Sequence, residues 1–182
     1  MSLEEKLEEI EDFEEAYYSR IQDMKDMSNV DRKIMKMHWG GVVIECLVKY
    51  IIVEKYDIHK RNKHKKCQWF SSNAENILKA KEQSGENITN SDYSNNAIKL
   101  EDGHNFNTMI KEILQLDTDG INEDLENVYE PLGKKFIDLR YEIEDLELIE
   151  ENYRKWEESY NKVVEWLNRE LDNLNGELEW YI

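Results

Sequence analysis

One apolar stretch, residues 31–58, constrains the fold more than any other part of the chain. It reads DRKIMKMHWGGVVIECLVKYIIVEKYDI, long enough for a helix of about 40 Å. Its apolar face is interrupted by His38, Gly40–Gly41, Glu45 and Lys49. Polar groups in an apolar helix cost free energy unless they find partners, and paired glycines weaken a helix unless another element must come close. The stretch is therefore predicted to be the packed centre of a bundle or the wall of a site.

The remaining apolar residues recur at steps of three and four, which predicts further helices. Their expected bounds are Leu3–Met27 within an N-terminal segment 1–29, Asn73–Gln83, Asn105–Leu116, Gly120–Tyr129, Gly133–Ile143 and Leu146–Leu174. Residues 59–104 are expected to form a basic loop (59–72), the short helix and a long polar loop (84–103). One Pro and seven Gly offer few turns for strands. The predicted fold class is all-α, a four-helix-type bundle with additional short helices and one long loop, in a single domain 1–182.

Charge is unevenly distributed along the chain, whose formal net charge is -17. This net charge argues against general nucleic-acid affinity, which needs a positive surface. Residues 4–15 hold eight carboxylates, whereas residues 59–66 hold five Lys or Arg and two His. The candidate RNA-contacting residues are Lys60, Arg61, Lys63, Lys65, Lys66 and Trp69, since cations beside an aromatic ring can grip a single strand. The alternative is a solvated loop with Trp69 and Phe70 folded into the core.

Cysteine use and hydropathy bear on the compartment. Cys46 and Cys67 form no disulfide framework, and the acidic N-terminus has no signal-peptide pattern, so a cytoplasmic location is expected. The longest apolar run, residues 40–53, contains two charged side chains and is too short to span a bilayer. No membrane association is expected. No metal or other cofactor is expected either, because the only His and Cys group lies among five cations that repel a divalent ion.

A polar strip is expected along the long helix. Glu45 and Lys49 are four residues apart in the orientation that favours an ion pair, and His38 lies seven residues before Glu45. His104 and Arg140 could meet this strip from other helices. The strip would either bind a nucleotide or similar polar ligand, or form a satisfied network that fixes helix register, and the structural interpretation is favoured.

Arg32 and His38 are the candidate catalytic residues for RNA cleavage. A histidine can move a proton from a 2′-hydroxyl, and an arginine can hold the phosphate. Six residues apart, they do not share a helical face, although two helices of a dimer could bring them together. The alternative is an arginine at the helix start and a packed histidine. Gly40–Gly41 is interpreted as a packing feature that permits a close helix crossing.

Four segments resemble the HEPN family of helical-bundle proteins. Residues 38–41 (HWGG) and 45–49 (ECLVK) resemble its second-helix pattern, an aromatic-glycine turn followed by E-x-x-L-K. Residues 103–106 (GHNF) resemble its short G/K-H-N/D-L segment, and residues 139–141 (LRY) resemble the L-R-Y before the last helix. Residues 153–171 match the last helix in placement and apolar spacing. The resemblance covers roughly residues 30–170.

The resemblance implies a homodimeric α-bundle in an RNA-targeting or toxin–antitoxin defence system, with RNA or a small nucleotidyltransferase as partner. Active members cleave RNA without a metal, using R-x4-6-H at the start of the last helix. This sequence departs from that pattern, because no histidine follows His104. A metal-independent endoribonuclease is therefore less favoured than a non-catalytic role. The alternatives are a protein–protein interaction module, or a nucleotide-binding bundle using Glu45, Lys49, His104 and Arg140.

Overall fold

A computed structural model describes residues 3–27, 32–100, 103–142 and 146–179. The chain divides into two compact units. Unit 1 comprises residues 1–12 and 52–103, and unit 2 comprises residues 13–51 and 104–182. Compact units are not the same as independently folding domains, so the single domain expected from the sequence stays a prediction. Asp31, which begins the apolar stretch and is an expected cap of its helix by residue type, lies outside the described residues.

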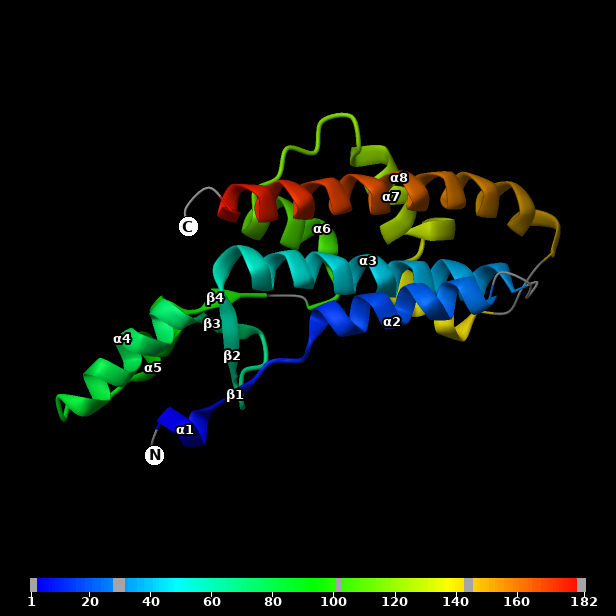
Figure 1. Ribbon diagram of the computed structural model, residues 1–182. Helices are drawn as coiled ribbons and strands as arrows, with labels where there is room; N and C mark the ends of the chain where they lie inside the picture. Colours follow the sequence, from blue (N-terminus) through cyan, green and yellow to red (C-terminus); the bar gives the residue numbers. More distant parts are fainter. Residues whose placement is uncertain (1–2, 28–31, 101–102, 143–145, 180–182) are drawn as a thin grey trace. The chain divides into compact units, whose positions relative to one another are not determined.

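Unit 1 is a small sheet covered by short helices (Figure 1). Its four strands pair antiparallel in the order β1-β2-β3-β4. Its elements are α1 (Leu3–Lys6), β1 (Leu7–Glu9), β2 (Ile58–Asn62), β3 (Gln68–Ser71), α4 (Ser72–Gln83), α5 (Asn90–Asn96) and β4 (Ile98–Lys99). The long helix α3 (Lys33–Tyr56) begins in unit 2 and leads into β2.

This sheet corrects three expectations. The chain is mostly helical, as predicted, but it is not all-α. The helix expected over Leu3–Met27 is instead α1, β1 and a separate helix that begins at Phe13. The basic loop expected over residues 59–72 is a β-hairpin. Both errors have one cause, because the acidic segment pairs with the basic one as neighbouring strands, and this tertiary pairing overrides the local helix propensity.

The polar segment 84–103 also contains regular structure. Thr89 and Asp92 form a capping box, in which the Asp92 amide donates to the Thr89 hydroxyl and the Thr89 amide donates to the Asp92 carboxylate. This box begins α5. The neighbouring helix α4 was correctly expected, and its cap is Ser71, whose Oγ accepts a hydrogen bond from the Ala74 amide.

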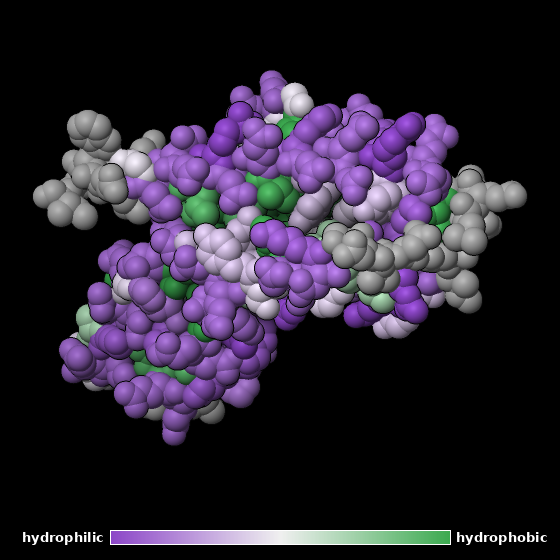
Figure 2. Space-filling view, turned by 45° about the vertical axis from the view of Figure 1, so that its right-hand side comes forward, coloured by the Kyte–Doolittle hydropathy of each residue, from purple (hydrophilic) through white to green (hydrophobic). Residues whose placement is uncertain are grey.

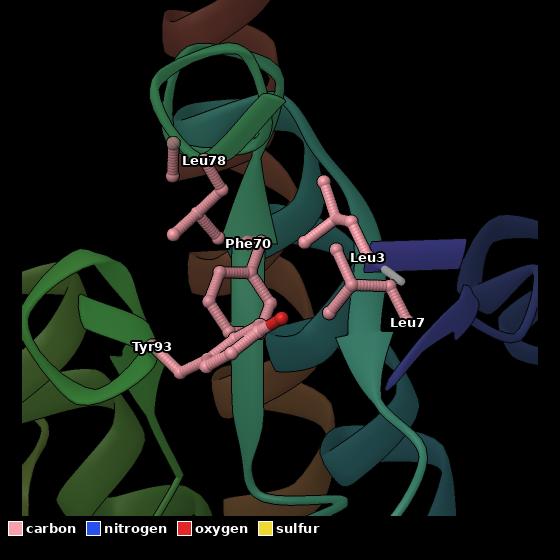
Figure 3. Packing of buried hydrophobic residues seen from close by; sticks show 6 residues of the cluster. Leu3, Leu7, Phe70, Leu78 and Tyr93 are labelled. Carbon is pink, nitrogen blue, oxygen red and sulfur yellow. The ribbon is translucent and has the colours of Figure 1, made fainter. Parts of the chain in front are cut away.

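A compact apolar cluster holds unit 1 together. Phe70 of β3 packs edge-on against Tyr93 of α5, with ring centroids 6.1 Å apart. Leu3 and Leu7 approach the same cluster from the N-terminal segment, and Leu78 approaches from α4 (Figure 3). All five side chains are buried. The N-terminal segment is therefore anchored by apolar burial as well as by its strand pairing.

Unit 2 is helical. Its elements are α2 (Phe13–Asp26), the first part of α3, α6 (Phe106–Thr108), η2 (Met109–Leu114), α7 (Asn122–Tyr129), η3 (Pro131–Gly133), η4 (Phe136–Tyr141) and α8 (Leu146–Glu179). Helices α3 and α8 run in the same direction, and α2 runs antiparallel to α3 (Figure 1). Apart from the N-terminal helix, these elements fall where helices were expected, and α8 continues beyond Leu174, where its end was expected.

The paired glycines of α3 permit close packing, as interpreted from the sequence. A Cβ at Gly40 would lie 2.3 Å from Cζ2 of Trp156, on α8. A Cβ at Gly41 would lie 2.2 Å from the Phe136 ring. Phe136 in turn stacks on Phe106 with ring centroids 5.5 Å apart. Aromatic rings thus occupy the volume that side chains at positions 40 and 41 would need.

The described surface is strongly polar. The face shown in Figure 2 is mostly hydrophilic, with small separate hydrophobic patches. Among the helices that the structure describes, none has the length and apolar character needed to cross a membrane.

Candidate functional site

The basic segment forms a tight β-hairpin in unit 1. Strand β2 pairs with β3 on one side and with β1 on the other, where Glu8 lies opposite Arg61 and Glu9 lies opposite Lys60. Asn62 organises the turn, because its Oδ1 accepts hydrogen bonds from the amides of His64 (2.9 Å) and Lys65 (3.1 Å). The cations between residues 60 and 66 are therefore held on a defined scaffold.

Arg61 is the most heavily engaged of these cations. Its Nε donates to Glu8 Oε1 at 2.7 Å, and its Nη1 donates to both oxygens of Glu11 at 2.5 and 2.6 Å. Lys66 also contacts the Glu8 carboxylate. Glu8 thus accepts from two cations at once, one from β2 and one from the hairpin turn.

The other hairpin lysines differ in their partners. Lys60 Nζ lies 2.5 Å from Glu9 Oε1, across the strand pair. Lys63 Nζ donates to the backbone carbonyl of Glu4 at 2.9 Å. Because a carbonyl oxygen carries no net charge, this bond does not neutralise the charge of Lys63. Lys65 is exposed. The hairpin consequently keeps part of its positive charge while the N-terminal carboxylates offset the rest.

Electrostatics at this surface follow from these contacts. Hydrogen bonds from Lys66 and then Arg61 hold the pKa of Glu8 below its ordinary value of 4.5. The hydrogen bond from Lys60 does the same to the pKa of Glu9 and raises the pKa of Lys60. These groups are exposed or only partly buried, so each pair contributes little to stability and is weakened by salt.

Trp69 does not serve as the expected stacking surface. It is buried, and its Nε1–H donates to the carbonyl of Lys66 at 3.1 Å. Phe70 is buried as well, in the unit 1 core. The alternative interpretation, in which both rings fold into the core, is the one the structure shows. RNA contact at this hairpin would rest on charge and hydrogen bonds alone.

In unit 2, three residues of the expected polar strip come together. Lys49 Nζ lies 2.5 Å from Glu45 Oε1, and His104 Nδ1 lies 3.0 Å from Glu45 Oε2. Lys49 also lies over the Phe13 ring, 5.5 Å from its centroid. Glu45 and Lys49 are largely buried, with side chains 10% and 13% exposed, and His104 is 58% exposed. Both oxygens of the carboxylate have partners, as a satisfied structural network requires.

Two expected members of the strip, Arg140 and His38, make other contacts in the described residues. Arg140 is exposed and its guanidinium lies over the Tyr141 ring, 4.7 Å from the centroid. His38 is half-buried, and its Nδ1 lies 2.9 Å from the carbonyl oxygen of Phe136. A carbonyl can only accept, so the His38 Nδ1 carries the proton and donates.

The candidate catalytic pair is not assembled within the described chain. Arg32 precedes α3, and its carbonyl accepts the Lys36 amide at 3.0 Å. Six residues along a helix separate Arg32 from His38 by about 9 Å of rise and place them on different faces. His38 also uses one ring nitrogen to hold Phe136. Its geometry fits a packing role, which was the alternative interpretation.

Metal-binding side chains and the cysteine thiols are the remaining candidates for chemistry. In the described ranges, no three His, Cys, Asp or Glu side chains gather in a way that could hold a metal ion. Both cysteines are free thiols. Cys67 is exposed, whereas burial, and then the nearby Glu45, raises the pKa of Cys46 and disfavours its reactive thiolate.

Sequence reasoning missed the glutamates that face the hairpin. Glu8, Glu9 and Glu11 lie within the helix that was expected over Leu3–Met27. The available signal was the complementarity of the two charge runs, residues 4–15 and 59–66, which antiparallel pairing of strands would bring into register.

Comparisons with known proteins leave the family open, since no family model, curated protein or solved structure matches this chain.

Proposed function

We propose that the protein is a non-cleaving, HEPN-like component of an RNA-targeting or toxin–antitoxin defence system, and that it contacts single-stranded RNA through the β2–β3 hairpin. One observation carries this proposal: the hairpin cations already bind a row of anions. The carboxylates of Glu8, Glu9 and Glu11 occupy the positions that phosphate oxygens of a strand would take. Charge-assisted contacts of this kind bind a carboxylate or a phosphate.

The same observation predicts weak RNA affinity in the wild-type protein. Phosphates must compete with three carboxylates that are tethered in place, because Leu7 anchors β1 in the core. The net charge of -17 opposes binding further. Replacing the three glutamates with glutamine should therefore free the hairpin cations for phosphate and add no new contact.

The proposed role is non-catalytic because the candidate residues of cleavage are separated and engaged. His38 holds the Phe136 carbonyl, and the Arg32 carbonyl caps the start of α3. The last helix also lacks the histidine that active family members use. Within a single chain, Arg32 and His38 therefore form no acid–base pair among the described contacts.

The test is fluorescence anisotropy with a labelled oligouridine at low salt. The variant carries Glu8→Gln, Glu9→Gln and Glu11→Gln, and is called here the hairpin-unmasked variant. We expect it to bind at least about tenfold more tightly than wild type, because local carboxylates no longer compete with phosphate. A matched control carries Glu151→Gln, Glu158→Gln and Glu165→Gln, which change net charge equally on the exposed side of α8.

The controls distinguish the effect of the hairpin charges on RNA affinity from the effect of the net charge. If the α8 control gains as much affinity as the hairpin-unmasked variant, net charge and not the hairpin controls binding, and the proposal fails. Adding Lys63→Glu and Lys65→Glu to the hairpin-unmasked variant should abolish the gain. Absence of binding by every variant would instead favour the protein–protein interaction module.

The family resemblance carries two further proposals, a homodimer and a small nucleotidyltransferase partner. Light scattering after size-exclusion chromatography tests the first. A mass of twice the chain's 21.9 kDa is expected, and a monomer at all concentrations would contradict it. Co-purification with a nucleotidyltransferase encoded beside this chain tests the second, and failure of the two proteins to associate would contradict it.

A further inference from the structure

We infer that unit 2 contains a binding pocket for a small, uncharged, largely apolar organic molecule that carries hydrogen-bonding groups. The pocket lies where the beginning of α3, the turn after α7, η4 and α8 meet, and its volume is about 580 Å³. Pockets that hold small organic ligands commonly measure about 300–1,000 Å³. The pocket lies within unit 2, far in sequence from the hairpin of unit 1, and is independent of the proposed RNA contact.

The lining supplies an apolar wall. Ile34, Leu139, Ile149 and Trp156 line the pocket, and each is at most 5% exposed as a residue. Because these side chains are already almost fully buried, a ligand body lying against them would gain mainly dispersion contacts and would displace little solvent. The indole Nε1–H of Trp156 has no hydrogen-bond partner among the described residues. An unpaired buried donor costs free energy, and this nitrogen has almost no accessible surface, so a ligand acceptor would reach it only after the indole ring shifted.

The charges around the pocket cancel, which selects against an ionic ligand. The lining contains two acids, Glu130 and Glu142, and two lysines, Lys134 and Lys155. Lys134 is paired with Glu142 at 2.6 Å inside the lining itself. Lys155 is paired with a residue outside the lining, Glu123, at 3.2 Å. A bound cation or anion would therefore lie near both the carboxylates and the lysines, and would be attracted by one kind and repelled by the other.

Neutral polar groups are present beside this wall. Asn127 donates its amide Nδ2–H to Ser159 Oγ at 3.1 Å, and Ser159 in turn donates to Asp124 at 2.8 Å. This chain fixes the orientation of the Asn127 amide and leaves its carbonyl oxygen as an acceptor for a ligand. Asn152 of α8 contributes a second amide to the lining. Hydrogen-bonding groups such as hydroxyls or amides on the ligand would match these side chains.

Backbone strain marks the edge of the pocket. Leu132 lines it and has φ 59°, ψ 22°, a left-handed conformation that is unusual for a residue with a branched side chain. The residue remains 37% exposed, and its side chain therefore gains little from burial. Strained residues of this kind concentrate at ligand sites, where their conformation positions a side chain for contact.

The test uses N-phenyl-1-naphthylamine, a neutral apolar dye that fluoresces when it leaves water. We expect saturable binding with one dye per chain. The sulfonated analogue 1-anilinonaphthalene-8-sulfonate should bind at least about tenfold more weakly, because the balanced charges of the pocket do not offset the cost of removing its sulfonate from water. Absence of saturable binding, or preference for the sulfonated dye, would overturn the inference.

Two occluding variants locate the dye. Asn152→Phe should reduce the affinity for the neutral dye at least about tenfold by filling the pocket from α8. Lys155→Phe, one helical turn further on, should do the same if the first variant folds poorly. The matched control, Arg169→Phe, adds the same ring to an exposed position of α8 outside the lining. An equal loss of dye affinity in the control, or no loss of dye affinity in either occluding variant, would contradict the assignment of the dye to this pocket.

Discussion

Gly40 of α3 lies so close to Trp156 of α8 that a single added carbon atom would overlap the indole ring, at 2.3 Å from its Cζ2. Trp156 has little freedom to move away, because it is buried and stacks on Tyr160 with ring centroids 5.1 Å apart. The approach of these two long helices in unit 2 thus depends on the absence of a side chain at position 40.

We predict that Gly40→Ala destabilises the protein by about 1–3 kcal/mol, the usual cost of overpacking a rigid core. Alanine improves helix propensity by about 1 kcal/mol, but the displaced indole outweighs this gain. Gly176→Ala is the matched control, because a Cβ there meets nothing within 4 Å. The control should be neutral or slightly stabilising in urea denaturation, and a stable Gly40→Ala protein would contradict the packing described here.

The Glu45–Lys49–His104 network is predicted to be structural. Glu45→Leu leaves Lys49 largely buried without its carboxylate, and we expect a loss of about 3 kcal/mol. Adding Lys49→Leu should recover part of that loss, because the unpaired charge is removed. His104→Asn should cost less than about 1 kcal/mol, since the side chain is mostly exposed. These values are measured by urea denaturation.

A ligand-binding role for the same network makes a different prediction. ATP or GTP would then raise the melting temperature of wild type and not of Glu45→Leu with Lys49→Leu. We expect no shift in either protein. A shift confined to wild type would show that the network is a nucleotide site.

His38→Ala is predicted to leave RNA unchanged and to reduce stability by about 1 kcal/mol, through loss of the hydrogen bond to Phe136. The measurement is incubation of end-labelled RNA with each protein at low salt without metal. We expect intact RNA in both reactions. Cleavage by wild type that disappears in His38→Ala would establish a metal-independent ribonuclease and contradict the non-catalytic role.

Acidification is predicted to remove the contribution of the strand–hairpin ion pairs. The pKa values of Glu8 and Glu9 lie below 4.5 in the folded protein because Lys66, Arg61 and Lys60 favour the charged carboxylates. A lowered carboxyl pKa stabilises the fold fully above the ordinary value, and the contribution is lost as the pH falls through the lowered pKa.

The unfolding free energy of wild type should therefore converge on that of the hairpin-unmasked variant as the pH falls below about 4.5. Urea denaturation across this pH range measures the difference. A constant difference down to the lowest pH at which the protein folds would show that these carboxylates are not coupled to the hairpin cations.

Local pattern was sufficient to predict the two longest helices. The long apolar stretch identified α3 and the apolar periodicity identified α8, and Gly40–Gly41 was correctly interpreted as a packing feature. The Glu45–Lys49 contact followed from its four-residue spacing. Such features depend on residues within one or two helical turns, which the sequence displays directly.

The sheet could not be found in the same way. Strand β1 has three residues, is rich in glutamate and reads as the start of a helix. Its conformation is set by β2, about fifty residues later in the chain, through backbone pairing and the Glu8–Arg61 contact. Non-local pairing of this kind overrides weak local propensity, and only the complementary charge of the two segments pointed to it.

The pocket of unit 2 was equally inaccessible from the sequence. Its wall combines Ile34 with Leu139 and Trp156, residues from three separate elements whose apolar character only predicts burial. The left-handed conformation of Leu132 has no local signature, because leucine seldom adopts it.

The most direct test of the central claim is the salt dependence of oligouridine binding by the hairpin-unmasked variant. If five hairpin cations meet phosphates, the logarithm of affinity should fall with the logarithm of salt concentration with a slope of up to about -3.5. Each of Lys63→Ala and Lys65→Ala should reduce the slope by about 0.7. A slope that neither substitution changes would place any RNA contact elsewhere and contradict the account.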